Sequence, residues 1–150
     1  MNQEYKEATR QFWEYFKNGV EVKISTSEGD NVSVASVSMA AGGKKLYFAT
    51  PEHSLQRTQL NMNPYVSLCA QHISVTGKAR DLELASSPAN KEIWELLTSV
   101  FPREFTNPSG LALAEITPLT GGFADRRTGE NFIIDFIHQT AAKTEQETPN

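Results

Sequence analysis

The stretch VSVASVSMAAGGKKLYFATPEHSLQRTQLNMNPYVSLCAQHISVTGKARD (residues 32–81) decides the fold, because short apolar runs in it alternate with strong turn signals. Gly42-Gly43 is a turn signal, and Asn63-Pro64 ends the short helix that precedes it. The connections between the apolar runs are too short for crossover helices, so antiparallel pairing is expected. The elements predicted after the Gly-Gly turn are strands over residues 46–50, 65–71 and 74–84 and a helix over residues 54–62.

The run before the Gly-Gly turn is also a predicted strand, but its apolar residues change parity. Val32 and Val34 share one face of an extended chain, whereas Val37 and Met39 share the other. A β-bulge near Ala35-Ser36 would reconcile the two sets. Since bulges help a sheet to bend, this interpretation favours a barrel.

The flanking sequence continues the pattern in both directions. Ser87 followed by Pro88 predicts the start of a helix, and further strands are predicted over residues 20–25, 111–117 and 131–137. Near the N-terminus, an aromatic stripe at helical spacing is expected to pack on a barrel or on a second subunit. The stripe consists of Tyr5, Ala8, Phe12 and Phe16.

These elements predict a mainly β fold class, a small closed or split antiparallel barrel of about six to seven strands with about three helices. A chain of 150 residues suits one core. We expect a single domain over residues 1–137 and a polar, mobile tail over residues 138–150.

Composition narrows the classes of function. The formal net charge of −4 and the absence of a basic stripe argue against nucleic-acid binding. No apolar run reaches the roughly 18 residues of a membrane span, and the N-terminus lacks the pattern of a signal peptide. A cytoplasmic location is therefore expected. The single cysteine, Cys69, lies in an apolar run and is predicted to be a buried thiol.

The stretch resembles a known family in the order of its parts. The aromatic strand LYFAT (46–50), the short helix, NPYVSL (63–68) and SVTGKAR (74–80) together resemble the core of the pyridoxamine 5'-phosphate oxidase-like FMN-binding split barrels. The match covers residues 32–81, which is a third of the chain. The resemblance implies a homodimer with FMN molecules at the subunit interface.

The resemblance also implies residues that lie near the flavin ring. A polar side chain near the flavin is implied in the region of Gln71 and His72. The edge of the isoalloxazine would be lined, mainly through backbone groups, by Ser36, Val37, Ser38 and Met39. The three histidines show no metal-ligand spacing, so a metal site is not predicted.

A phosphate site is implied where the short helix begins. Thr50 matches the strand-end threonine near the ribityl chain, and Ser54 matches a phosphate-contacting serine at a helix N-terminus, which favours anions. The family places basic residues directly after this serine, but here they are Leu55 and Gln56. Arg57 follows about 100° further around the helix. It is either the cation that completes the site beside Gln56 or an ordinary solvated helix residue.

The predicted function is an FMN-binding oxidoreductase that acts on a small-molecule substrate. It is expected to be distinct from true pyridoxamine-phosphate oxidases, because residues 121–136 lack their Arg- and His-containing substrate motif. No side chain stands out as a general acid or base, so the flavin would carry the electrons. Leu55 and Gln56 favour an alternative, a non-enzymatic dimer that has lost FMN or binds another ligand such as haem. A dimer without any ligand is a third interpretation.

Overall fold

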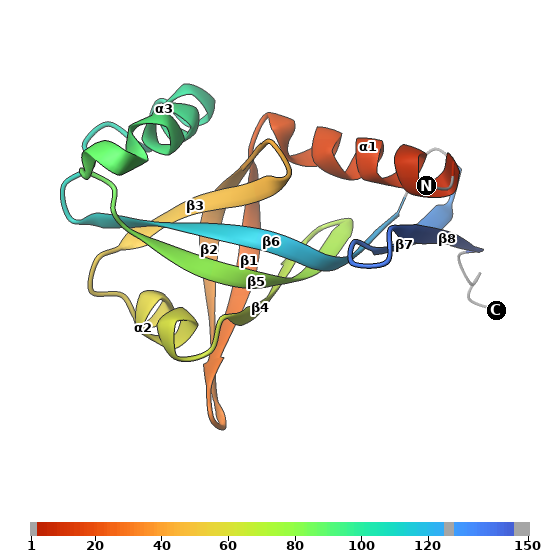
Figure 1. Ribbon diagram of the computed structural model, residues 1–150, viewed down its shortest axis with the longest axis horizontal. Helices are drawn as coiled ribbons and strands as arrows, with labels where there is room; N and C mark the ends of the chain where they lie inside the picture. Colours follow the sequence, from red (N-terminus) through yellow and green to blue (C-terminus); the bar gives the residue numbers. More distant parts are fainter. Residues whose placement is uncertain (1–2, 125–127, 146–150) are drawn as a thin grey trace.

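The computed structural model describes residues 3–124 and 128–145. Within these ranges the chain forms an eight-stranded sheet with helices packed around it (Figure 1). The helical elements are α1 (Gln3–Lys17), α2 (Leu55–Met62), the 3-10 turn η1 (Pro88–Asn90) and α3 (Lys91–Val100). The strands are β1 (Val20–Glu28), β2 (Asn31–Gly42), β3 (Lys45–Pro51), β4 (Tyr65–Ala70), β5 (Ile73–Leu84), β6 (Leu111–Ala124), β7 (Glu130–Asp135) and β8 (Thr140–Glu145).

The sheet closes because β3 pairs with both β2 and β6. The order β3-β2-β1-β4-β5-β6, together with the β3–β6 pairing, makes a closed antiparallel barrel. One edge of β6 is long enough for two partners, since residues 111–116 pair with β3 and residues 120–124 pair with β7, while the other edge pairs with β5. The hairpin of β7 and β8 therefore extends beyond the barrel, as Figure 1 shows on its right side. The predicted mainly β barrel is confirmed.

Close contact between β5 and β6 depends on one glycine. The register between these strands shifts between Thr76 and Gly77. A Cβ atom on Gly77 would lie 2.6 Å from Cγ2 of Ile116 and 2.9 Å from the carbonyl oxygen of Thr117. Only glycine lets the backbones approach this closely without a clash.

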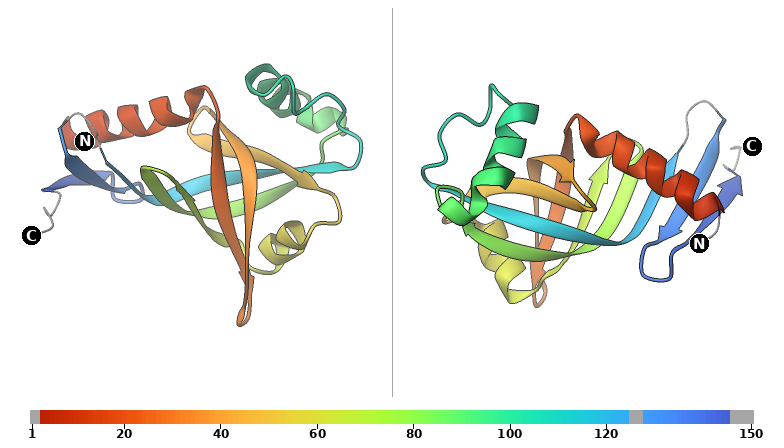
Figure 2. Two further views of the ribbon diagram at one scale, coloured as in Figure 1. Left: turned by 180° about the vertical axis from the view of Figure 1, so that it is seen from behind. Right: turned by 45° about the horizontal axis from the view of Figure 1, so that its top comes forward.

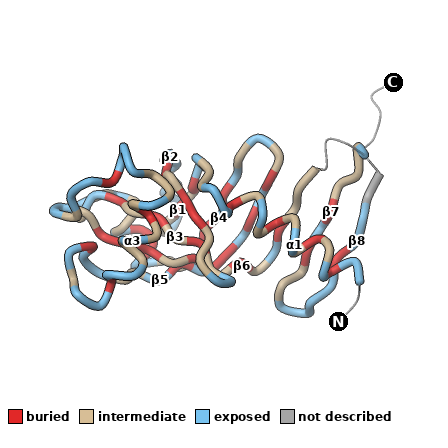
Figure 3. Tube along the Cα trace, turned by 90° about the horizontal axis from the view of Figure 1, so that it is seen from above, coloured by how far each residue is buried: buried red, intermediate tan, exposed pale blue. Residues whose placement is uncertain are grey.

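The main core fills the barrel and continues under α1, whose buried residues are the predicted stripe of Tyr5, Ala8, Phe12 and Phe16 (Figure 3). α1 packs against β2, β7 and β8. The ring centroid of Phe12 lies 5.3 Å from that of Phe16 and 5.0 Å from that of Phe136. Because the stripe is buried within its own chain, it gives no support to a subunit contact.

The other helices cover separate parts of the barrel (Figure 2). α3 contributes Leu97 to a second cluster, which includes Phe105 and Leu113. α2 begins after Ser54 and ends before Asn63, in agreement with the predicted helix. Inside, the hydroxyl of Thr26 donates to Oε1 of Gln59 at 2.7 Å, and this buried bond ties α2 to β1.

The predicted bulge near Ala35-Ser36 is wrong. β1 and β2 pair without interruption, from Val20 opposite Met39 to Glu28 opposite Asn31. The change of parity has another cause, because Val32 and Val34 are 66% and 62% exposed on the outer face. These two valines cover no part of the core of their own chain.

The C-terminal region also differs from the prediction. Thr140–Glu145, which was assigned to the tail, forms β8 and pairs with β7. Ala141 is buried in the main core, so the domain extends to at least residue 145. Residues 146–150 of the predicted tail lie outside the described ranges. Among the described helices, none is long and apolar enough to cross a membrane.

Candidate functional site

The predicted phosphate residues Thr50 and Ser54 meet at the N-terminus of α2. Their hydroxyl oxygens are 2.8 Å apart and share a hydrogen bond. The Ser54 oxygen also accepts from the backbone N–H of Arg57 at 3.2 Å, which makes Ser54 the N-cap of α2. Thr50 is only 3% exposed. The two hydroxyls are therefore engaged in ending β3 and starting the helix.

Arg57 is held by carboxylates from β5. Its Nε donates to Oδ2 of Asp81 at 2.9 Å, and one terminal nitrogen donates to Oε2 of Glu83 at 3.2 Å. The other terminal nitrogen donates to the carbonyl oxygen of Glu52 at 3.1 Å. The Arg57 side chain is 18% exposed. Every nitrogen of this guanidinium thus has an acceptor.

The carboxylate of Asp81 is itself firmly placed. It accepts from Nδ2 of Asn61 at 2.7 Å and from the backbone N–H of Glu83 at 2.8 Å, in addition to Arg57. Burial raises the pKa of Asp81, but the hydrogen bonds from Asn61, the Glu83 N–H and Arg57 outweigh it, so the pKa lies below its usual value. The carboxylate therefore stays ionised.

Glu83 lies at an irregular point of β5 and adopts a left-handed backbone with φ of 71°. This conformation is unfavourable for a residue with a Cβ. The Glu83 carboxylate lies 3.2 Å from a terminal nitrogen of Arg57. Arg57, Asp81 and Glu83 together carry a net charge of −1, from one cation and two carboxylates.

These residues do not fit a flavin phosphate. A phosphate dianion at this helix end would meet the carboxylates of Asp81 and Glu83, and each nitrogen of the Arg57 guanidinium already donates to an oxygen of the protein. Gln56 is half-buried in the first turn of α2 and brings no charge. The interpretation of Arg57 as an ordinary solvated residue is also wrong, because it forms an ion pair.

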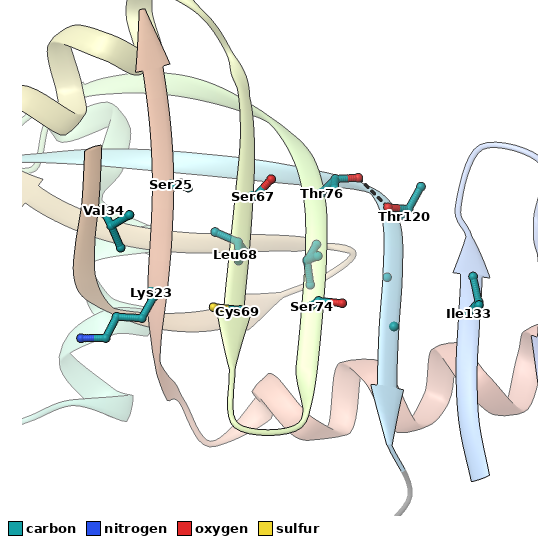
Figure 4. Close-up of a pocket in the computed structure, with 13 residues that line it drawn as sticks. Lys23, Ser25, Val34, Ser67, Leu68, Cys69, Ser74, Thr76, Thr120 and Ile133 are labelled. Atoms are coloured by element: carbon teal, nitrogen blue, oxygen red, sulfur yellow. Dashed lines mark hydrogen bonds between the residues drawn. The ribbon is translucent and has the colours of Figure 1, made fainter. Parts of the chain in front are cut away.

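A groove on the outer face of the barrel is a better candidate site (Figure 4). One hollow of this groove has a volume of about 530 Å³, which lies within the range of small-molecule sites. The floor consists of short side chains on β1, β4, β5 and β6, and Val34 and Ile133 form apolar rims. The lining includes Lys23, Ser25, Val34, Ser67, Cys69, Ser74, Thr76, Thr120 and Ile133.

A second hollow of about 650 Å³ continues from the first. The two share Cys69, Ser74, Gly122 and Ile133. The second hollow also includes the β4–β5 turn, where His72 lies. We call the two hollows together the outer groove.

Two polar groups mark the outer groove. The ammonium of Lys23 donates to the hydroxyl of Ser36 on the neighbouring strand, which places this predicted residue beside the groove. At the other end, Nε2 of His72 is buried and has no hydrogen-bond partner among the described residues. Because a buried unpaired imidazole nitrogen costs free energy, a hydrogen-bond partner for Nε2 of His72 would be stabilising.

The other predicted ring residues are not brought into the groove. Val37 and Met39 point into the core and are 9% and 0% exposed, so only their backbone groups could contact a ligand. The hydroxyl of Ser38 donates to Oε2 of Glu104 at 2.6 Å, in the loop after α3. The predicted set is therefore divided between the core, the α2 end, the loop after α3 and the outer groove.

Several groove residues were missed from the sequence. The prediction of a buried thiol is wrong, because Cys69 is exposed in the groove while its neighbour Leu68 is buried. Lys23 pairs with Cys69 across β1 and β4. The sequence shows which residues of one strand share a face. It does not show which residues of neighbouring strands lie opposite each other. The described residues hold no group of side chains suited to a metal ion.

Comparison with known proteins supports the fold. No family model matches the sequence, and no curated protein matches it. Among solved structures, a pyridoxamine 5'-phosphate oxidase-related FMN-binding protein from Nostoc punctiforme has a TM-score of 0.65 at 10% identity, over 99% of this chain and 98% of that one.

Two further structures show the range of proteins with this architecture. General Stress Protein 26 from Bacillus anthracis has a TM-score of 0.57 at 21% identity, over 75% of this chain and 91% of that one. HutZ, a heme storage protein from Vibrio cholerae, has a TM-score of 0.58 at 12% identity, over 77% of this chain and 91% of that one. The chain therefore has the split-barrel fold of the pyridoxamine 5'-phosphate oxidase-like FMN-binding proteins.

Proposed function

We propose that the protein is a homodimeric flavin-binding oxidoreductase of a small-molecule substrate, distinct from pyridoxamine-phosphate oxidase. The observation that carries the proposal is the outer groove, with a cation at Lys23 and an unpartnered imidazole nitrogen at His72. The shared fold with the FMN-binding protein from Nostoc supports the flavin class. FMN was the predicted cofactor, but the α2 end does not match its phosphate.

The residues of the outer groove suit a planar ring. Short side chains such as Ser67 and Thr76 leave the sheet face open to a flat ligand. Nε2 of His72 can exchange a hydrogen bond with a polar ring atom, and Lys23 supplies positive charge. A bound flavin would supply the electron-transfer chemistry, while the protein binds, orients and shields the ring. A nearby cation such as Lys23 favours the negative charge of a reduced flavin.

The homodimer is proposed because the groove is open and its apolar rims are exposed. Val32, Val34 and Ile133 are 66%, 62% and 57% exposed around it. A second copy packed on this face would cover the valines and exclude water from the groove. A stable dimer of this kind should bury about 2,000 Å² or more. Sedimentation of the parent and of Val34→Lys tests this, with Leu55→Lys on α2 as the control.

We expect a dimer for the parent and for Leu55→Lys, and a monomer for Val34→Lys. A monomeric parent would contradict the proposed dimer. A dimeric Val34→Lys would show that the interface does not include Val34. The cytoplasmic location stays a prediction from the sequence.

A second candidate function, haem binding, is favoured by one feature. Imidazole nitrogen is an axial ligand of haem iron, and Nε2 of His72 is unpartnered. HutZ, which has a similar fold, is described as a heme storage protein. The visible spectrum of the purified protein separates the two candidates. Flavin bands support the proposal, and a Soret band that is lost in His72→Ala supports haem binding.

A groove-filling variant tests the site itself. Ser67→Trp places a large ring on the floor of the outer groove, whereas Ser99→Trp places the same ring on the exposed side of α3. We expect the first change to abolish binding of riboflavin and the second to leave it unchanged. Retained binding in Ser67→Trp would place the ligand outside the groove.

A further inference from the structure

The end of α2 has a specific arrangement that the proposed function leaves unused. All three nitrogens of the Arg57 guanidinium donate to oxygen atoms, two of them to carboxylates. The cation that could attract an anion to this helix end is therefore neutralised. Ser54, the other candidate anion contact, is engaged with Thr50 and with the Arg57 N–H.

The carboxylate of Asp81 has partners besides Arg57. Asp81 is fixed by Asn61 and by the N–H of Glu83, so its position does not depend on the arginine alone. Glu83 keeps its unfavourable left-handed backbone, with φ of 71°, within this arrangement. Asp81 and Glu83 together present two negative charges at the place where a phosphate would have to lie.

We infer that Asp81 and Glu83 close the N-terminal end of α2 to anions, so that the protein selects a flavin by its ring and not by its phosphate. The ligand class rests on the proposed function, whereas the closure rests on the contacts of Arg57. Two consequences follow. Inorganic phosphate does not bind at Arg57, and riboflavin and FMN bind the parent protein with similar affinity.

The closure is tested directly with inorganic phosphate and needs no flavin. The Nε–H signal of Arg57 is followed by NMR during a phosphate titration, and its assignment is confirmed by its loss in Arg57→Lys. We expect no saturable shift in the parent. In the double variant Asp81→Asn/Glu83→Gln, which frees Arg57, a saturable shift is expected. A saturable shift in the parent would overturn the inference.

Flavin selection is tested by titrating the parent with FMN and with riboflavin. We expect the two dissociation constants to agree within about threefold, which is less than one charged hydrogen bond contributes. The double variant should prefer FMN by about tenfold or more, because a freed guanidinium can bond to the phosphate. A tenfold or larger preference for FMN corresponds to about one charged hydrogen bond. Such a preference in the parent, lost in Arg57→Ala, would overturn the inference that the flavin is selected by its ring.

The two experiments separate failure of the inference from failure of the proposed function. If neither flavin binds, the proposed function fails, while the phosphate titration still decides whether the α2 end is closed. If riboflavin binds and phosphate also binds at Arg57, the proposed function stands and the inference fails.

Discussion

Replacing Asp81 by alanine should lower the free energy of unfolding by about 3 kcal/mol. The side chain is 10% exposed and accepts from Asn61, Arg57 and the Glu83 N–H at 2.7, 2.9 and 2.8 Å. Hydrogen bonds to a charged group contribute about 1.5–3 kcal/mol each, but these three share one carboxylate and do not add. Removing one partner of a largely buried pair costs about 3–5 kcal/mol.

The variant leaves Arg57 with Glu83, whose side chain is 77% exposed and whose ion pair is weak. The loss should appear in urea unfolding as a lower midpoint with an unchanged m value. It corresponds to a fall of roughly 6–12 °C in Tm. Glu83→Ala is the matched control and should cost less than about 1 kcal/mol. Equal losses in the two variants would refute the assignment of Asp81 as the main partner.

Three further outcomes are expected. The pKa of Asp81 is lowered below 3.8 in the folded protein. Its ionised carboxylate therefore stabilises the fold fully above that pH, and this stabilisation is lost as the pH falls through the folded pKa. The stability of Asp81→Asn should lack this part of the pH dependence in acid unfolding. Gly77→Ala should destabilise the barrel by about 1–3 kcal/mol in urea, since its Cβ would meet Ile116 and the Thr117 backbone. Cys69 should react with a thiol reagent in the monomeric Val34→Lys variant, in which no second copy covers the groove; an inert thiol there would contradict its exposure.

Local signals predicted α2 and α1 well. Ser54 caps α2 and Asn63 follows its end, as the residue types required, and the stripe from Tyr5 to Phe16 is the buried face of α1. Such features depend on neighbours in sequence. β8 was missed because its alternation is short and polar, and its stability comes from pairing with β7.

The groove and the Arg57 cluster depend on contacts between distant residues. Lys23 and Cys69 are 46 positions apart and become opposite partners only through the β1–β4 register. Arg57 reaches Asp81 and Glu83 across 24 and 26 positions, at an irregular point of β5. No local pattern in the sequence indicates these pairings, so the sequence could suggest an anion site at α2 but could not show the carboxylates that surround Arg57.

The outer groove is proposed to bind a flavin ring. Titration of the purified protein with riboflavin, followed by quenching of the ligand's fluorescence, tests it most directly. We expect saturable binding with one riboflavin for each chain and a dissociation constant in the micromolar range. Fluorescence that stays unchanged at every protein concentration tested, in a folded parent, would contradict the claim.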